Sequence, residues 1–93
     1  MTKIAIVQQP PVYLDKQRSL ERAASLIAEA AAQGAGLVAF PEVWLPGYPT
    51  YVWRLRPGAD MRQTDELFAL SQANSVDLAR GDLAPVREAA REH

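Results

Sequence analysis

The chain has 93 residues, of which 48% are hydrophobic and 23% are charged, and its formal net charge is −1. This composition is that of an ordinary globular protein and argues against a disordered chain. The near-neutral charge offers no basic surface to nucleic acid or to an anionic membrane, so we expect neither partner. The absence of cysteine excludes a disulfide scaffold and a thiolate zinc site within these residues.

The strongly apolar stretches are short, the longest being residues 4–7 and 36–40. A transmembrane helix needs roughly 20 such residues. The N-terminus also lacks the long apolar region and the small-residue cleavage site of a signal peptide. We therefore expect a cytoplasmic protein with no membrane partner.

Two buried strands are predicted in the first half of the chain. Residues 3–9, KIAIVQQ, are rich in β-branched residues and are followed by two prolines, which is typical of the end of a strand. Residues 36–40, GLVAF, are apolar at nearly every position. A strand without polar alternation is usually covered on both faces, as in a parallel sheet.

A helix is predicted between these strands, over residues 16–33. Asp15 is a suitable N-cap and Gly34 a suitable C-terminal stop. The order strand, helix, strand predicts a right-handed crossover. Apolar residues spaced by three and four place one face of the helix against the sheet; they are Leu20, Ala23, Ala24, Ile27, Ala30 and Ala31.

The second half of the chain predicts an irregular segment and two short helices. Residues 51–63 are turn-rich, and residues 64–74 predict a helix with Thr64 as its cap. Residues 81–93 predict another helix, capped by Asp82. The fold class is therefore α/β. Because two parallel strands leave unpaired edges, we expect residues 1–93 to be the first part of a larger domain.

The segment FPEVWLPGYP, residues 40–49, places Glu42 two residues beyond the end of the second predicted strand. In open α/β sheets, functional side chains gather just beyond the carboxyl ends of the strands. Glu42 is therefore a candidate general base or acid. Its position alone leaves a structural role equally open, in which the carboxylate caps the following backbone or pairs with Arg54 or Arg56.

Four aromatic residues in and after this segment have two interpretations. They either line a small-molecule pocket or pack beneath the loop, and their spacing alone favours packing. They are Trp44, Tyr48, Tyr51 and Trp53.

Taken in order, the strand IAIVQ, the helix end AAAQGAGLVAF and the segment FPEVWLPGYP resemble the nitrilase, or carbon–nitrogen hydrolase, superfamily. The resemblance covers the whole chain. FPE alone would indicate only the superfamily, which includes amidases and carbamoylases, whereas PEVWLPGYP with Trp53 beyond it looks more like the nitrilase branch. The resemblance implies a four-layer αββα sandwich, of which residues 1–93 would be the N-terminal part, and a homo-oligomer at full length.

The superfamily uses a Glu-Lys-Cys triad, and the resemblance implies that Glu42 is its glutamate and that Tyr48 lines the substrate pocket. The chain has no cysteine, and Lys3 and Lys16 do not match the lysine. The full-length chain is thus expected to hydrolyse an organic nitrile to a carboxylic acid and ammonia, and these 93 residues alone are expected to be inactive. No cofactor is expected, because the chain has no phosphate-binding loop and no spacing of metal ligands.

Two other functions stay open at this point. The first is an amidase or carbamoylase of the same superfamily. The second is a truncated relative without catalysis, which acts through its helices as a binding or assembly module. The sequence does not identify the nitrile or amide.

Overall fold

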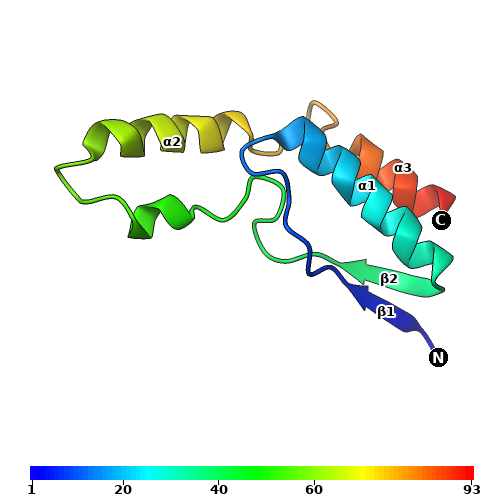
Figure 1. The fold of residues 1–93 in the computed structure, drawn as a ribbon. Helices are drawn as coiled ribbons and strands as arrows, with labels where there is room; N and C mark the ends of the chain where they lie inside the picture. The colour runs from blue at the N-terminus through cyan, green and yellow to red at the C-terminus, as the bar shows by residue number, and fades with distance from the viewer.

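A computed structural model describes all of residues 1–93 and contains two strands, three α-helices and one 3₁₀ helix (Figure 1). The order of elements confirms the predicted α/β class, with strand, helix and strand followed by two helices. The elements are β1 (Lys3–Ile6), α1 (Lys16–Ala32), β2 (Ala35–Ala39), the 3₁₀ helix η1 (Thr50–Trp53), α2 (Met61–Ala73) and α3 (Ala84–Glu92).

The two strands pair in parallel, with Ile4 opposite Leu37 and Ile6 opposite Ala39. One further bond follows the last pair, from the Val7 amide to the Ala39 carbonyl at 2.9 Å. β1 is shorter than the predicted strand over residues 3–9, because the ladder ends where β2 ends. The carboxyl ends of both strands therefore lie at the same edge of the sheet.

The prediction that both strands are buried is wrong for this chain. Ile4, Ile6 and Leu37 are each more than half exposed. α1 lies against β2, and α3 lies alongside α1 (Figure 1). The helices cover one face of the two-stranded sheet, and the other face, which is also apolar, stays exposed. The N-terminal part of an αββα sandwich would look the same before a second sheet packs on that face.

α1 begins and ends as the sequence predicts, to within one residue. The Asp15 carboxylate accepts a hydrogen bond of 3.1 Å from the Arg18 amide, which satisfies one of the free donors of the first turn. Gly34 has φ +90°, a left-handed conformation that ends helices and that glycine adopts without strain. The predicted apolar face is confirmed at its centre, where Leu20, Ala23 and Ile27 are buried.

The predicted cap of the second helix is wrong. α2 begins at Met61, three residues before Thr64, and Asp60 precedes it. The Thr64 hydroxyl instead donates to the Asp60 carbonyl at 3.0 Å from within the helix. The Asp60 carboxylate is bound by the backbone and side chain of Arg56, so it stabilises the turn before α2.

The predicted cap of the last helix is also wrong. α3 begins at Ala84, and no side chain caps it. The Asp82 carboxylate is engaged elsewhere, because it accepts bonds of 2.7 Å from both the Lys16 ammonium and the Asp77 amide. Asp82 thus connects the segment before α3 to the start of α1.

The pair η1 and α2 extends away from the rest of the molecule (Figure 1), and neither element contains a buried residue. The radius of gyration is 15.7 Å, against about 12 Å for a compact domain of this length. None of the three α-helices combines the length and the apolar composition that crossing a bilayer requires.

Candidate active site

Glu42 lies in the turn that follows β2, at the edge of the sheet where both strands end. Its side chain borders an open groove of about 540 Å³, which it shares with Gln8 and Gln9 from the segment after β1. This placement is the one that the strand-helix-strand pattern predicts. The remaining residues of the groove are Ile6, Val7, Pro10, Pro11, Pro41, Val43, Trp44 and Tyr48.

The Glu42 carboxylate has neither of the structural partners that the sequence left open. It caps no backbone amide, and Arg56 pairs with Asp60, at 3.1 Å between Nε and Oδ2. Arg54 makes no ion pair with any carboxylate of the chain. Glu42 is exposed to the groove and its oxygens are free to accept a proton or a hydrogen bond.

The backbone next to Glu42 is strained. Val43 has φ +57°, a left-handed conformation in which a β-branched residue is a genuine outlier. Such conformations cost about 1 to 3 kcal/mol each and persist only where the surroundings hold them. The turn is closed by the Gly47 amide, which lies 3.1 Å from the Val43 carbonyl.

Trp44 packs beneath the loop and also borders the groove. Only 6% of its surface is exposed, and its ring meets Phe40 edge-on at 5.0 Å between centroids. Its indole Nε1 donates a 2.8 Å hydrogen bond to the backbone carbonyl of Gln9. Trp44 therefore fits both interpretations, and its hydrogen bond ties the loop to the segment after β1.

Tyr48 lies in the groove with Glu42 and is half exposed. Its ring stacks on that of Trp53, with centroids 5.6 Å apart and planes 19° from parallel. Tyr51 points to a different place, since its hydroxyl lies 3.5 Å from that of Ser71 on α2. Of the four aromatic residues, two border the groove, Trp44 and Tyr48. Trp53 stacks on Tyr48, and Tyr51 contacts α2.

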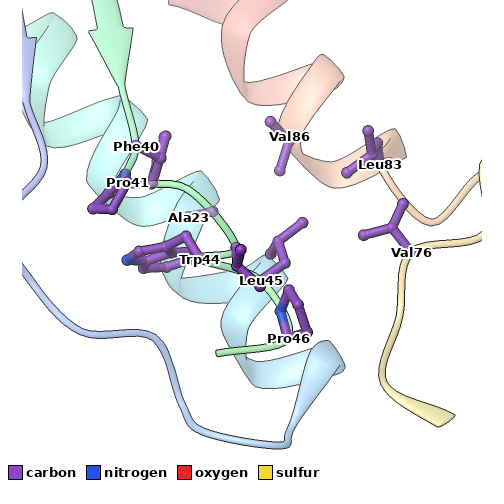
Figure 2. A pocket seen from close by; sticks show the side chains of 10 residues that line it. Ala23, Phe40, Pro41, Trp44, Leu45, Pro46, Val76, Leu83 and Val86 are labelled. Atoms are coloured by element: carbon purple, nitrogen blue, oxygen red, sulfur yellow. The ribbon is translucent and has the colours of Figure 1, made fainter. Parts of the chain in front are cut away.

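An apolar cavity of about 320 Å³ lies on another side of the same loop, between it and the start of α3 (Figure 2). Glu42 is not among its lining residues, so the loop presents its apolar side chains to the helices and its carboxylate to the groove. The labelled side chains that converge there include Phe40, Trp44, Leu45 and Pro46 from the loop and Leu83 and Val86 from the α3 region.

Sequence reasoning missed the contacts of Gln9 and Arg22. Nη2 of Arg22 on α1 donates a 2.8 Å hydrogen bond to Oε1 of Gln9. A polar residue followed by Pro10 and Pro11 signals a restricted backbone, but it does not reveal a partner 13 residues later.

The charged pairs that perturb titration lie outside the groove. The Lys16 ammonium, assisted by the Asp77 amide, holds the pKa of Asp82 below its usual range. The Arg56 guanidinium likewise lowers the pKa of Asp60, and the Asp60 carboxylate raises the pKa of Arg56. These pairs stabilise turns and are separate from the candidate base.

Comparison with known proteins finds related sequences over nearly the whole chain. Residues 3–93 match the family model for carbon-nitrogen hydrolase. The chain is 41% identical over 91 residues to an arylacetonitrilase of Aspergillus niger, which covers 98% of this chain and 26% of the relative. It is 40% identical over 92 residues to an aliphatic nitrilase of Rhodococcus rhodochrous, covering 98% of this chain and 24% of the relative.

The chain thus spans about a quarter of the length of these relatives. The match extends over nearly all of its own length and includes the loop that carries Glu42. The chain belongs to the carbon–nitrogen hydrolase family.

Proposed function

We propose that residues 1–93 are the N-terminal part of a nitrilase and that Glu42 is the general base of its Glu-Lys-Cys triad. The observation that carries the proposal is the Glu42 carboxylate, which has no partner in this chain and lies at the carboxyl edge of a parallel sheet, in a groove with Tyr48. The relatives named arylacetonitrilase and aliphatic nitrilase support nitrile hydrolysis as the reaction.

The chemistry explains why a carboxylate belongs at this position. A free thiol has a pKa near 8.5, so only a few per cent is thiolate at neutral pH. Glu42 would take the thiol proton as sulfur attacks the nitrile carbon, which gives a covalent thioimidate. Water then releases ammonia and leaves a thioester, and a second water frees the carboxylic acid. The triad lysine would stabilise the charge that develops on nitrogen.

A chimera tests this proposal. In it, the matching segment of the Aspergillus niger arylacetonitrilase is replaced by this chain, and the rest of the relative supplies the lysine and the cysteine. The chimera should release ammonia from phenylacetonitrile. Glu42→Gln keeps the shape of the side chain but cannot accept the proton, so turnover should fall by roughly 10²-fold or more.

Two controls define the result. Glu66→Gln changes an exposed carboxylate of α2 that pairs only with Arg62, and it should leave turnover unchanged. Phenylacetamide, offered in place of the nitrile, separates an amidase from a nitrilase. A Glu42→Gln chimera that keeps more than about a tenth of its activity would assign Glu42 a structural role. A chimera that folds like its parent but hydrolyses neither compound would favour a non-catalytic module.

A further inference from the structure

Gln9, in the segment after β1, forms hydrogen bonds with α1 and with the loop that carries Glu42. Its side-chain Oε1 accepts a 2.8 Å bond from Nη2 of Arg22 on α1. Its backbone carbonyl accepts a 2.8 Å bond from Nε1 of Trp44. Because Trp44 is two residues after Glu42, a continuous set of hydrogen bonds runs from α1 to the loop that carries the carboxylate.

The backbone of Gln9 is restricted before any of these contacts forms. Pro10 follows it, and steric contact with the proline ring confines the preceding residue to extended conformations. Pro10 is followed by Pro11 and is restricted in the same way. The direction of the Gln9 carbonyl is thereby limited, so the two prolines present a fixed acceptor to Trp44 in addition to ending β1.

Trp44 needs this acceptor. Its indole is buried, and a buried N–H without a partner is costly, so the bond to Gln9 selects one position for the ring. Val43 lies between Trp44 and Glu42 and has a strained φ of +57°. A strained residue relaxes when its surroundings no longer hold it. Loss of the indole bond would therefore release the turn that carries Glu42.

Arg22 gives a second indication that this arrangement is held. Its Nε is shielded from solvent and has no partner, while Nη2 bonds to Gln9. An unpaired buried donor is unfavourable. The guanidinium therefore keeps its position because of the bond to Gln9, although its Nε has no hydrogen-bond partner there.

We propose that Trp44 is a positioning residue for Glu42 and that it acts through its hydrogen bond to Gln9, which Arg22 supports. This inference rests on the proposed function of Glu42 as general base. The indole N–H holds the loop so that the carboxylate stays at the edge of the sheet, where it can reach the thiol. A misplacement of about 1 Å at such a site costs roughly 10²-fold in rate.

The chimera described above tests the inference by turnover. Trp44→Phe keeps an aromatic ring against Phe40 and removes the N–H donor together with part of the indole ring. It should lower kcat for phenylacetonitrile by about tenfold or more, with KM changed by less than about threefold. The reason is that the hydrogen bond of Trp44 to Gln9 positions Glu42 and does not bind the substrate. Arg22→Met should lower kcat by about fivefold, the worth of one hydrogen bond. Arg62→Met, an exposed arginine of α2, is the matched control and should change neither parameter.

A second readout separates positioning from a general structural role. The rate at which iodoacetamide alkylates the triad cysteine, followed by mass spectrometry at neutral pH, reports activation of the thiol without needing turnover. Trp44→Phe and Glu42→Gln should each slow alkylation, and the double variant should be no slower than Glu42→Gln alone. If Trp44→Phe slows alkylation equally with and without Glu42, Trp44 is structural and the inference is overturned.

The two proposals fail in different ways. If Glu42→Gln changes neither turnover nor alkylation, the proposed function is wrong, and the positioning role falls with it. If Glu42→Gln slows both while Trp44→Phe changes neither, Glu42 stays the base and only the positioning role is overturned.

Discussion

The ring of Tyr13 occupies the space into which a side chain at Gly47 would project. A Cβ built on Gly47 would overlap Cδ1 of Tyr13, and Gly47 also has φ +85°. The loop of Glu42 therefore closes against the segment before α1 at a point that admits only glycine. Gly58 has a similar φ of +79° but no atom within 4 Å of its Cβ position.

This difference predicts that Gly47→Ala destabilises the fold more than Gly58→Ala. The left-handed conformation should cost about 1 to 2 kcal/mol at either glycine, and only Gly47→Ala must also displace Tyr13. Thermal unfolding of the two chimera variants measures the difference as a lower Tm for Gly47→Ala. Adding Tyr13→Ala to Gly47→Ala should recover part of the loss. Equal Tm values for the two single variants would show that the ring of Tyr13 can move aside without destabilising the fold.

Tyr48 is predicted to affect substrate binding more than the chemical step. It borders the groove of Glu42 and stacks on Trp53, so Tyr48→Ala removes an aromatic surface next to the Glu42 carboxylate. Aromatic contacts of this kind contribute about 0.5 to 1.5 kcal/mol beyond area burial, which corresponds to roughly a twofold to tenfold rise in KM for phenylacetonitrile. Tyr48→Phe keeps the ring and should retain the KM of the unaltered chimera. A Tyr48→Ala chimera with the same KM as the unaltered chimera would exclude Tyr48 from the pocket.

The pair of Lys16 and Asp82 predicts a pH-dependent contribution to stability. The pKa of Asp82 is lower in the folded state, first because of the hydrogen bond from Lys16. A carboxylate with a depressed pKa stabilises the fold above its unfolded value, about 3.9, and this contribution is lost as the pH falls through the folded value. Asp82→Asn should therefore lower Tm at pH 7 and make progressively less difference below about pH 4.

Asp65→Asn is the control for this prediction, because Asp65 lies on α2, is exposed and makes no ion pair. Its effect on Tm should be small at every pH. A difference between Asp82→Asn and the unaltered chimera that stays constant from pH 7 to pH 3 would contradict the role of the charge.

The parts of the fold that the sequence predicts are those set by local chemistry. Asp15 and Gly34 fix the ends of α1 through contacts within a few residues, and the ends of two strands place Glu42 at the sheet edge. The missed features depend on residues far apart in the chain. Asp82 does not cap α3 because it pairs with Lys16, 66 residues earlier. The indole of Trp44 donates its hydrogen bond to Gln9, 35 residues earlier.

The isolated chain is predicted not to be a stable, cooperatively folded monomer. Only 8 of its 93 residues are buried, and a two-stranded sheet is marginal in water without further cover. Both strands keep a free edge and exposed apolar side chains, which favours association between copies. α1 is rich in alanine and should keep its helical far-UV signal. We expect a broad thermal transition and aggregation that increases with concentration.

Sedimentation and a denaturant titration at low micromolar concentration measure this outcome. Ile6→Lys is an informative variant, because Ile6 is 72% exposed on β1 and a lysine there opposes pairing between strand edges. It should reduce aggregation without producing a sharp unfolding transition, since the charge blocks association but adds no buried surface. A monodisperse monomer with one sharp transition would contradict the prediction. It would show that eight buried residues and two strands are enough for a cooperative fold, and would favour the binding module over the enzyme segment.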